Sequence, residues 1–208
     1  MIESLEEKER REERIMKRGK IIVLSAPSGS GKSTIIGELM KRPELELQFS
    51  ISATSRSPRG SEKHGREYFF LTEEEFKRRV EAGEFVEWEE VYAGVCYGTL
   101  ESEVERIIGS GHNLIMDVDV KGGLNIKKRF GDDVLTLFIM PPDKATLEAR
   151  LRNRGTDSEE TIRKRLEKSE YEMGFAGEFD KTVVNDKLGE TVEEVENAIR
   201  EFVGKEKR

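Results

Sequence analysis

The chain of 208 residues carries a formal net charge of −7, with 36 Lys and Arg against 43 Asp and Glu. This acidic balance argues against nucleic acid as a partner, because a phosphate backbone is bound by a basic surface. One cysteine and two histidines exclude an internal disulfide and a multi-cysteine or histidine-rich metal site. No apolar run reaches membrane-spanning length and no hydrophobic signal segment is present, so we expect a cytoplasmic protein with no membrane partner.

Residues 1–18 are mostly charged, which predicts a solvated N-terminal extension. From residue 19 onward, apolar runs typical of strands alternate with helical patterns. We predict strands at 20–25, 47–52, 113–120, 134–140 and 181–185. We predict helices at 32–41, 73–82, 101–109, 121–129, 143–153, 158–174 and 191–203, with capping boxes at Thr72/Glu75 and Asp157/Glu160. This order predicts an α/β fold in which helices cover both faces of a parallel sheet.

The stretch 53–99 interrupts this alternation. Its segments "REYFFL" (66–71) and "EFVEWEEVY" (84–92) alternate like small antiparallel strands. We therefore expect an inserted subdomain here.

A phosphate-binding loop is predicted from "LSAPSGSGKST", residues 24–34, which lies between a strand and a helix. Small residues let successive backbone N–H groups turn inward, and the following helix adds its positive end. Lys32 would reach the outer phosphates of a nucleoside triphosphate, and the hydroxyl of Ser33 or Thr34 would complete a Mg²⁺ shell. The usual pattern begins with Gly, where this chain has Ala26. The predicted phosphate-binding loop comprises Ala26, Pro27, Ser28, Gly29, Ser30, Gly31, Lys32, Ser33 and Thr34.

Two acids, Asp117 and Asp119, end the predicted strand "NLIMDVDV". Residues spaced by two on a strand point the same way, so we expect them to act together. One would serve the Mg²⁺ ion and the other the second substrate, and the pattern leaves open which does which.

A second anion site is predicted in the Gly/Pro/Ser-rich loop around Arg56 and Arg59, near Ser52, Ser55 and Tyr68. Guanidinium forks bind phosphate through two parallel hydrogen bonds. A phosphomonoester is the expected ligand.

These motifs together resemble the guanylate kinase family from about residue 19 to 204. The resemblance is carried by "SAPSGSGKST", by the S-x-x-S-R-x-x-R pattern at 52–59, by "GEFVEWEEV" with "YGT", by "DVDVKGG" and by "RLRNRGTDSEETIRKRL". It implies a P-loop nucleoside monophosphate kinase fold, with a core at 19–52, 100–145 and 170–204, a GMP-binding subdomain at 53–99 and a helical lid at 146–169. The implied reaction transfers the γ-phosphoryl group of ATP to GMP, and to dGMP, with Mg²⁺.

The resemblance also assigns roles to individual residues. Arg56, Arg59, Tyr68 and Tyr97 would hold the GMP phosphate, with Ser55 and the acids Asp117 and Asp119 also in the GMP site. Ser52, Glu87 and Thr99 would read the guanine, whose N1–H and N2 amino group a carboxylate can accept together. The lid would supply Arg150, Arg154 and Arg165 to the phosphates, and Asn185 would lie near the adenine.

Departures from the family pattern are Ala26, Ser55, Lys121 and one extra residue in "VYAGVCYGT", the segment that contains Tyr97. Two alternatives stay open at this level. One is a non-catalytic guanylate-kinase-like interaction domain, and the other is a kinase acting on a different phosphorylated acceptor.

Overall fold

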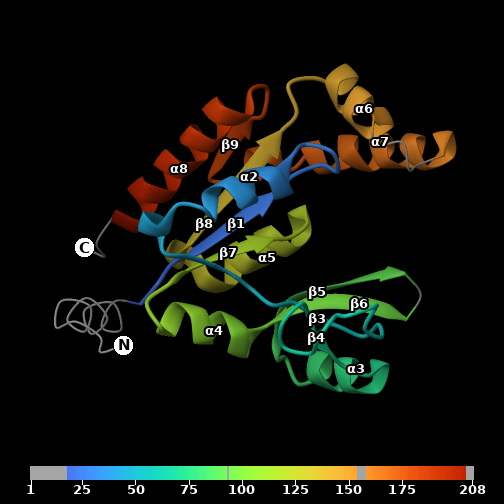
Figure 1. Cartoon of the computed structure of the whole chain (residues 1–208), viewed down its shortest axis with the longest axis vertical. Helices are drawn as coiled ribbons and strands as arrows, with labels where there is room; N and C mark the ends of the chain where they lie inside the picture. The colour runs from blue at the N-terminus through green and yellow to red at the C-terminus, as the bar shows by residue number, and fades with distance from the viewer. Residues whose placement is uncertain (1–17, 93, 154–157, 205–208) are drawn as a thin grey trace. The chain divides into compact units, whose positions relative to one another are not determined.

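The computed structural model describes residues 18–92, 94–153 and 158–204, and they form two compact units (Figure 1). The mixed-sheet unit contains Gln48–Leu114 with the described residues up to Lys20, and the parallel-sheet unit contains Ile21–Leu47 with the described residues from Ile115 onward. The boundary between them falls within strands β2 (Leu47–Phe49) and β7 (Asn113–Asp117).

The parallel-sheet unit is built on a five-stranded sheet in the order β2-β7-β1-β8-β9, which includes β1 (Ile21–Ser25), β8 (Val134–Met140) and β9 (Lys181–Val184). Strand β8 pairs in parallel with both β1 and β9. The helical elements of this unit are α2 (Lys32–Leu39), η1 (Pro43–Leu45), α5 (Val120–Phe130), η2 (Gly131–Asp133), α6 (Lys144–Asn153), α7 (Glu159–Met173), η3 (Ala176–Glu178) and α8 (Leu188–Gly204).

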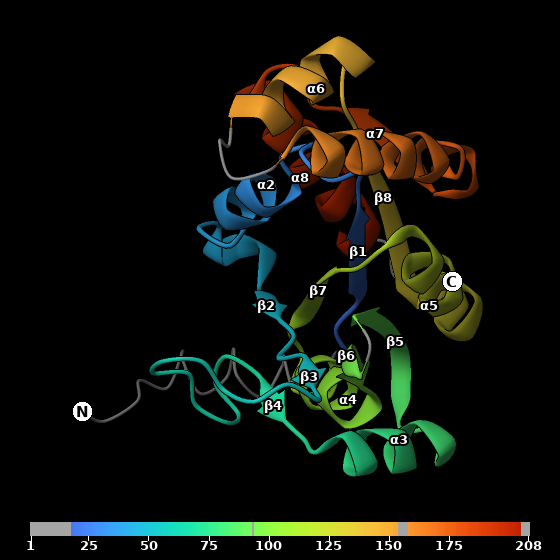
Figure 2. The same cartoon turned by 90° about the vertical axis from the view of Figure 1, so that its right-hand side faces the viewer.

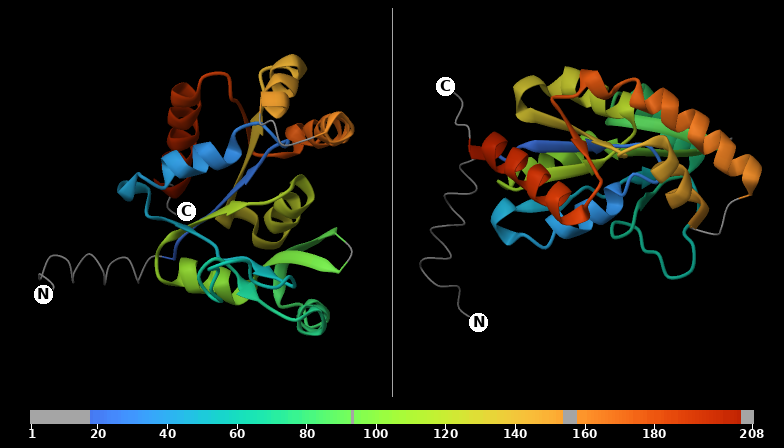
Figure 3. Two further views of the ribbon diagram at one scale, coloured as in Figure 1. Left: turned by 45° about the vertical axis from the view of Figure 1, so that its right-hand side comes forward. Right: turned by 90° about the horizontal axis from the view of Figure 1, so that it is seen from above.

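Alternating side chains on β8 explain why both faces of this sheet are covered. Leu137 and Ile139 pack into one buried cluster with residues of α2 and α8, while Phe138 packs with Val120 and Phe179 on the other face. Figure 3 (left) shows α2 and α8 on one side of the sheet and α5 on the opposite side. The predicted α/β architecture is confirmed.

The mixed-sheet unit contains a four-stranded sheet in the order β4-β3-β6-β5 and two helices, α3 (Glu73–Glu81) and α4 (Glu101–Gly109) (Figure 2). The strands are β3 (Ala53–Thr54), β4 (Phe69–Phe70), β5 (Phe85–Tyr92) and β6 (Val95–Leu100). Its core includes Phe76 of α3, stacked on Phe85 with ring centroids 4.5 Å apart. Thr72 caps α3 by accepting a hydrogen bond from the Glu75 backbone N–H, as its spacing predicts.

The expectation of purely antiparallel strands in this region is only partly correct. Strand β6 is antiparallel to β3 and β5, but β4 pairs with β3 in parallel. The long loop between Thr54 and Phe69 carries the chain back to the starting end of β3, so that β4 runs in the same direction as β3. The alternation of side chains along a strand does not reveal the direction of its neighbour.

The predicted strand 113–120 is too long. Strand β7 ends at Asp117, and Asp119 is the N-cap of α5, where its carboxylate accepts from the Gly122 backbone N–H at 2.8 Å. The two acids therefore do not lie on one face of one strand, because an Asp at this point is better used as a helix cap. At α7 the cap is Ser158, which accepts from the Thr161 backbone N–H, and the expected cap Asp157 lies outside the described residues. Within the described ranges, no helix is both long enough and apolar enough to span a membrane.

Candidate active site

The glycine-rich loop between β1 and α2 is shaped by two residues with left-handed backbone. Gly29 has φ 94° and Gly31 has φ 89°, values that other residues adopt only with strain. The turn is closed by a hydrogen bond from the Ser30 N–H to the Pro27 carbonyl at 3.1 Å. Helix α2 then begins at Lys32, so its first unpaired N–H groups lie at the end of the loop. This is the geometry of an anion cradle.

Asn185, which follows β9, holds this loop from a distant part of the chain. Its Nδ2 donates to the Ser30 carbonyl at 2.7 Å, and its own N–H donates to the Met140 carbonyl at 2.8 Å. The residue is only 5 % exposed. A Cβ added at Gly31 would lie 2.5 Å from Nδ2, so the close approach of Asn185 requires glycine there. The predicted place of Asn185 near the adenine stays a prediction.

Lys32 and Asp117 form an ion pair beside the loop. The distance from Nζ to Oδ1 is 2.5 Å, and Nζ also lies 3.4 Å from the Val118 carbonyl. Strand β7 ends at Asp117, next to β1 in the sheet, which is why the two side chains meet. An acid and a lysine are thus paired where the loop would hold the phosphates of a nucleotide.

Two of the three arginines predicted for a lid contact residues of this site. Nη1 of Arg165, on α7, donates to the Ser28 hydroxyl at 3.1 Å. Nη2 of Arg150, on α6, donates to the Asn185 carbonyl at 3.0 Å, while its Nη1 is buried without a hydrogen-bond partner among the described residues. Arg154 lies outside the described residues.

A cavity of about 330 Å³ is lined by residues 26–34 of the loop together with Asp117, Val118, Asp119 and Glu172. Glu172, on α7, is only 7 % exposed, and sequence reasoning missed it. A signal was present, because Glu172 follows Arg165 by seven residues and so lies on the same face of the helix. In the described ranges, no group of three or more His, Cys, Asp or Glu residues forms a preassembled metal site.

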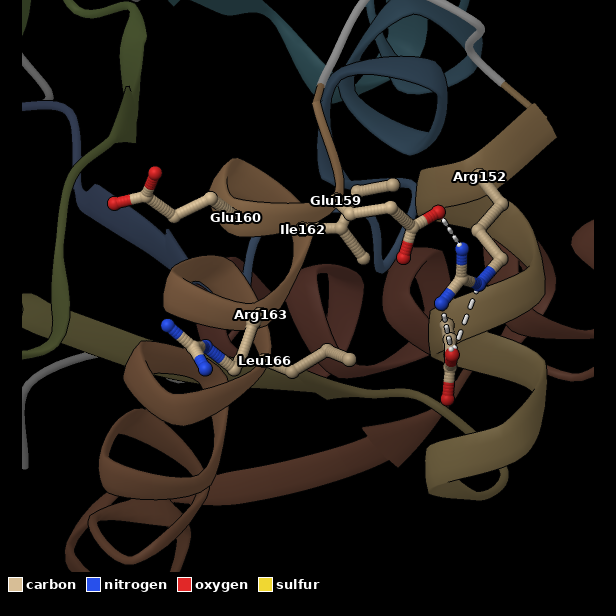
Figure 4. Close-up of a pocket in the computed structure, with 7 residues that line it drawn as sticks. Arg152, Glu159, Glu160, Ile162, Arg163 and Leu166 are labelled. Atoms are coloured by element: carbon tan, nitrogen blue, oxygen red, sulfur yellow. Dashed lines mark hydrogen bonds and ion pairs between the residues drawn. The ribbon is translucent and has the colours of Figure 1, made fainter.

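A larger cavity, of about 550 Å³, lies between α6 and α7 (Figure 4). Three of its charged side chains pair with one another: Arg152 bonds Glu148 and Glu159, which bridges the two helices. Arg152 lowers the pKa of the Glu159 carboxyl, so this bridge stays charged at neutral pH. No part of the glycine-rich loop lines this cavity.

In the mixed-sheet unit, the predicted phosphate ligands Arg56, Tyr68 and Tyr97 lie together. The Arg56 Nε donates to the Tyr97 hydroxyl at 3.1 Å, and the guanidinium lies 4.9 Å from the Tyr68 ring centroid. A carboxylate from Glu62 pairs with the same guanidinium. This raises the pKa of Arg56 further above its ordinary value, so the group is charged at any working pH.

The remaining predicted ligands of this unit differ in how they are engaged. The Thr99 hydroxyl donates to Glu87 Oε1 at 2.7 Å, which orients that carboxylate. The Ser55 hydroxyl donates to the Gly94 carbonyl and accepts from the Cys96 N–H, so it ties the β5–β6 hairpin to β3. The Ser52 carbonyl accepts from the Phe69 N–H at 2.9 Å. The Arg59 side chain is exposed.

The fold and the loop define a class of protein. A glycine-rich loop between a parallel strand and a helix, with a lysine paired to a carboxylate and an arginine contacting the loop, defines a nucleotide-binding kinase of the P-loop type.

Comparisons with known proteins give the family. The family model described as guanylate kinase matches residues 18–202. The chain is 56 % identical over 186 residues to a guanylate kinase of Porphyromonas gingivalis, covering 89 % of this chain and 99 % of that protein. It is 54 % identical over 188 residues to a guanylate kinase of Bacteroides thetaiotaomicron, covering 90 % and 92 %. A crystal structure of guanylate kinase from Anaplasma phagocytophilum matches with a TM-score of 0.69 at 28 % identity, covering 91 % of this chain and 88 % of that one. The chain therefore belongs to the guanylate kinase family.

Proposed function

We propose that this chain phosphorylates GMP with ATP, that residues 26–34 bind the ATP phosphates, and that the subdomain at 53–99 binds GMP. The assignment of residues 26–34 to the ATP phosphates rests on the cavity lined by the loop, Lys32 and Asp117. The chain is an enzyme, a kinase that binds nucleotides.

Lys32 is expected to stabilise the negative charge of the phosphoryl group as it is transferred. Its ammonium now neutralises Asp117, and a bound triphosphate would offer it stronger anionic partners. The lid arginines add charge to the same point, because Arg165 already contacts Ser28 of the loop. Segment 146–169 is the proposed lid, which would exclude water from the reacting groups.

Mg²⁺ is part of this proposal, and the donor set fits it. Ser33 offers a hydroxyl and Asp117 a carboxylate, and magnesium takes oxygen ligands while keeping waters and phosphate oxygens in its shell. When bound, the ion would neutralise charge on the β- and γ-phosphates. Asp119 is less suited to a direct ligand role, because one of its oxygens caps α5.

In the GMP site, the proposed base reader is Glu87, which Thr99 holds in place. Guanine presents two donors, N1–H and the N2 amino group, that a carboxylate accepts, whereas adenine would present the lone pair of N1. An unpaired carboxylate against the wrong base costs far more than a loose fit. The acceptor phosphate is already ionised near neutral pH, so no side-chain base is needed.

A cytoplasmic location completes the proposal. It is supported by the presence of a single cysteine, Cys96, which leaves no internal disulfide to form.

The test is an acceptor screen. ADP release from Mg-ATP is measured with GMP, dGMP, AMP, CMP and UMP as acceptors, for the wild type and for Glu87→Gln. We expect turnover with GMP and dGMP and little with the others. A chain that binds no Mg-ATP would instead be a non-catalytic interaction domain, and a chain that prefers another acceptor would refute the Glu87 assignment.

A further inference from the structure

The carboxylate of Glu62 lies against the guanidinium of Arg56 in the loop that joins β3 to β4. Glu62 Oε2 accepts from Arg56 Nη1 at 2.7 Å, and Oε1 accepts from Nη2 at 2.8 Å. The pair is well shielded, because the Arg56 side chain is 9 % exposed and the Glu62 side chain 23 %. Sequence reasoning gave Glu62 no role.

This pair limits what Arg56 can offer to a phosphate. A guanidinium has five N–H donors. Nε donates to Tyr97, Nη1 donates to the Ser57 carbonyl and to Glu62, and Nη2 donates to Glu62. One N–H, on Nη2, remains, so Arg56 has no free two-pronged edge while Glu62 is in place.

Glu62 is also fixed by its own loop. Its Oε2 accepts from the Arg59 backbone N–H at 2.8 Å, and the Glu62 N–H donates to the Arg59 carbonyl at 3.1 Å, which closes a turn. The bonds from Arg56 and then from the Arg59 backbone lower the pKa of Glu62 to about 2. The carboxylate is therefore ionised throughout the range in which a kinase is assayed. Moving it would break three hydrogen bonds that involve charged groups.

The Arg56–Glu62 pair also bears on which hydrogen bonds Tyr97 and Arg59 can donate to an anion. Because the Tyr97 hydroxyl accepts from Arg56 Nε, its own proton points elsewhere and can be donated to an anion. The Arg59 guanidinium, in contrast to that of Arg56, donates no hydrogen bond to another described residue and keeps its full fork.

We infer that Glu62 is a positioning residue for the acceptor phosphate: it stays bound to Arg56, orients Tyr97 through Arg56, and leaves Arg59 to supply the bidentate fork. The inference rests on the proposed function, in which this cluster binds the phosphate of GMP. It makes a definite alternative testable, namely that Glu62 is a competitor that the phosphate displaces from Arg56.

The experiment compares Glu62→Gln with Glu67→Gln by steady-state kinetics against GMP and against ATP. Glu67 is a matched control, because it lies in the same loop, accepts from the Lys63 N–H at 2.7 Å and does not contact Arg56. We expect Glu62→Gln to raise KM for GMP about 10- to 100-fold while kcat and KM for ATP stay within about two-fold. Glu67→Gln should leave all three constants unchanged.

A double-mutant cycle separates positioning from general damage. In an Arg56→Lys background, Glu62→Gln should add less than about two-fold to KM for GMP, because its effect passes through the guanidinium. Full additivity would overturn the inference, as would an unchanged or lowered KM for GMP in the single variant; a lowered KM would identify Glu62 as the displaced competitor.

If Glu62→Gln melts below the assay temperature, the comparison is made with Glu62→Asp, which keeps the charge on a side chain one methylene shorter and so cannot reach Arg56 with both oxygens from the same backbone position. It should then raise KM for GMP by a smaller factor, and an unchanged value would overturn the inference. A wild-type chain without GMP turnover would contradict the proposed function itself, independently of these variants.

Discussion

Replacing Gly31 by alanine tests how the glycine-rich loop is held. The residue has φ 89°, and the new Cβ would lie 2.5 Å from Nδ2 of Asn185. Asn185 cannot yield freely, since it is buried and its Nδ2 donates to the Ser30 carbonyl at 2.7 Å. The substitution therefore forces both a strained backbone and the loss of a buried hydrogen bond.

The cost can be worked from these two parts. A left-handed backbone costs about 1–2 kcal/mol for a residue with a Cβ, and a buried hydrogen bond left unmade costs about 1–3 kcal/mol. The free energy of unfolding should thus fall by about 2–5 kcal/mol, which for a chain of this size lowers Tm by about 4–20 °C. Differential scanning calorimetry measures the shift, and KM for ATP should rise because the cradle is distorted.

Gly37 provides the matched control. It lies within α2, and a Cβ there meets nothing within 4 Å, so Gly37→Ala should stabilise the chain by about 0.5–1 kcal/mol through helix propensity. In an Asn185→Ala background, Gly31→Ala should cost only the backbone part, about 1–2 kcal/mol. A Gly31→Ala protein with the Tm of the wild type would refute this account of the loop. So would a double variant whose loss of unfolding free energy equals the sum of the losses in the two single variants.

Further expectations concern the phosphates, the base, the metal and acid stability. Lys32→Ala should lower kcat for ADP release by about 10²–10³-fold with the fold intact by circular dichroism, and retained turnover would remove Lys32 from the phosphate site. Glu87→Gln should raise KM for GMP by about 10–100-fold and leave KM for ATP unchanged, and equal effects on both would contradict its role as base reader. EDTA should abolish ADP release and excess MgCl₂ should restore it, and activity that survives chelation would argue against a metal requirement. Burial by itself would raise the pKa of Asp180, but the Thr136 backbone N–H and the Lys127 ammonium outweigh it and lower that pKa. The resulting stability is complete above the unfolded value of about 3.9 and is lost as pH falls through the lower folded value. Asp180→Asn should therefore lower the free energy of unfolding by about 1 kcal/mol at pH 7 and reduce its fall at acid pH, both measured by urea denaturation at several pH values. An unchanged fall at acid pH would show that Asp180 does not contribute to this pH dependence.

Local features of the site were predictable because they depend on neighbours in the sequence. The loop at 24–34 combines small residues with a preceding apolar strand and a following helix, and the structure has β1, the loop and α2 in that order. Helix α4 was predicted at 101–109 and lies at Glu101–Gly109, since its period and ends are local signals. Asp117 and Asp119 were predicted to lie on one strand because the sequence "DVD" is compatible both with a strand and with a helix cap. In the structure β7 ends at Asp117 and Asp119 caps α5, so the two acids have different local roles.

By itself, then, the amino-acid sequence determined the fold class, the glycine-rich loop between β1 and α2, and the residue types gathered around Arg56. The tertiary structure decided which groups meet across long separations: Asn185 reaches Ser30, 155 residues away, Arg165 reaches Ser28, 137 residues away, and the Arg56 fork is already taken by Glu62. Such partnerships depend on sheet order and on the competition of donors for acceptors in three dimensions, and no periodicity along the chain encodes either of them.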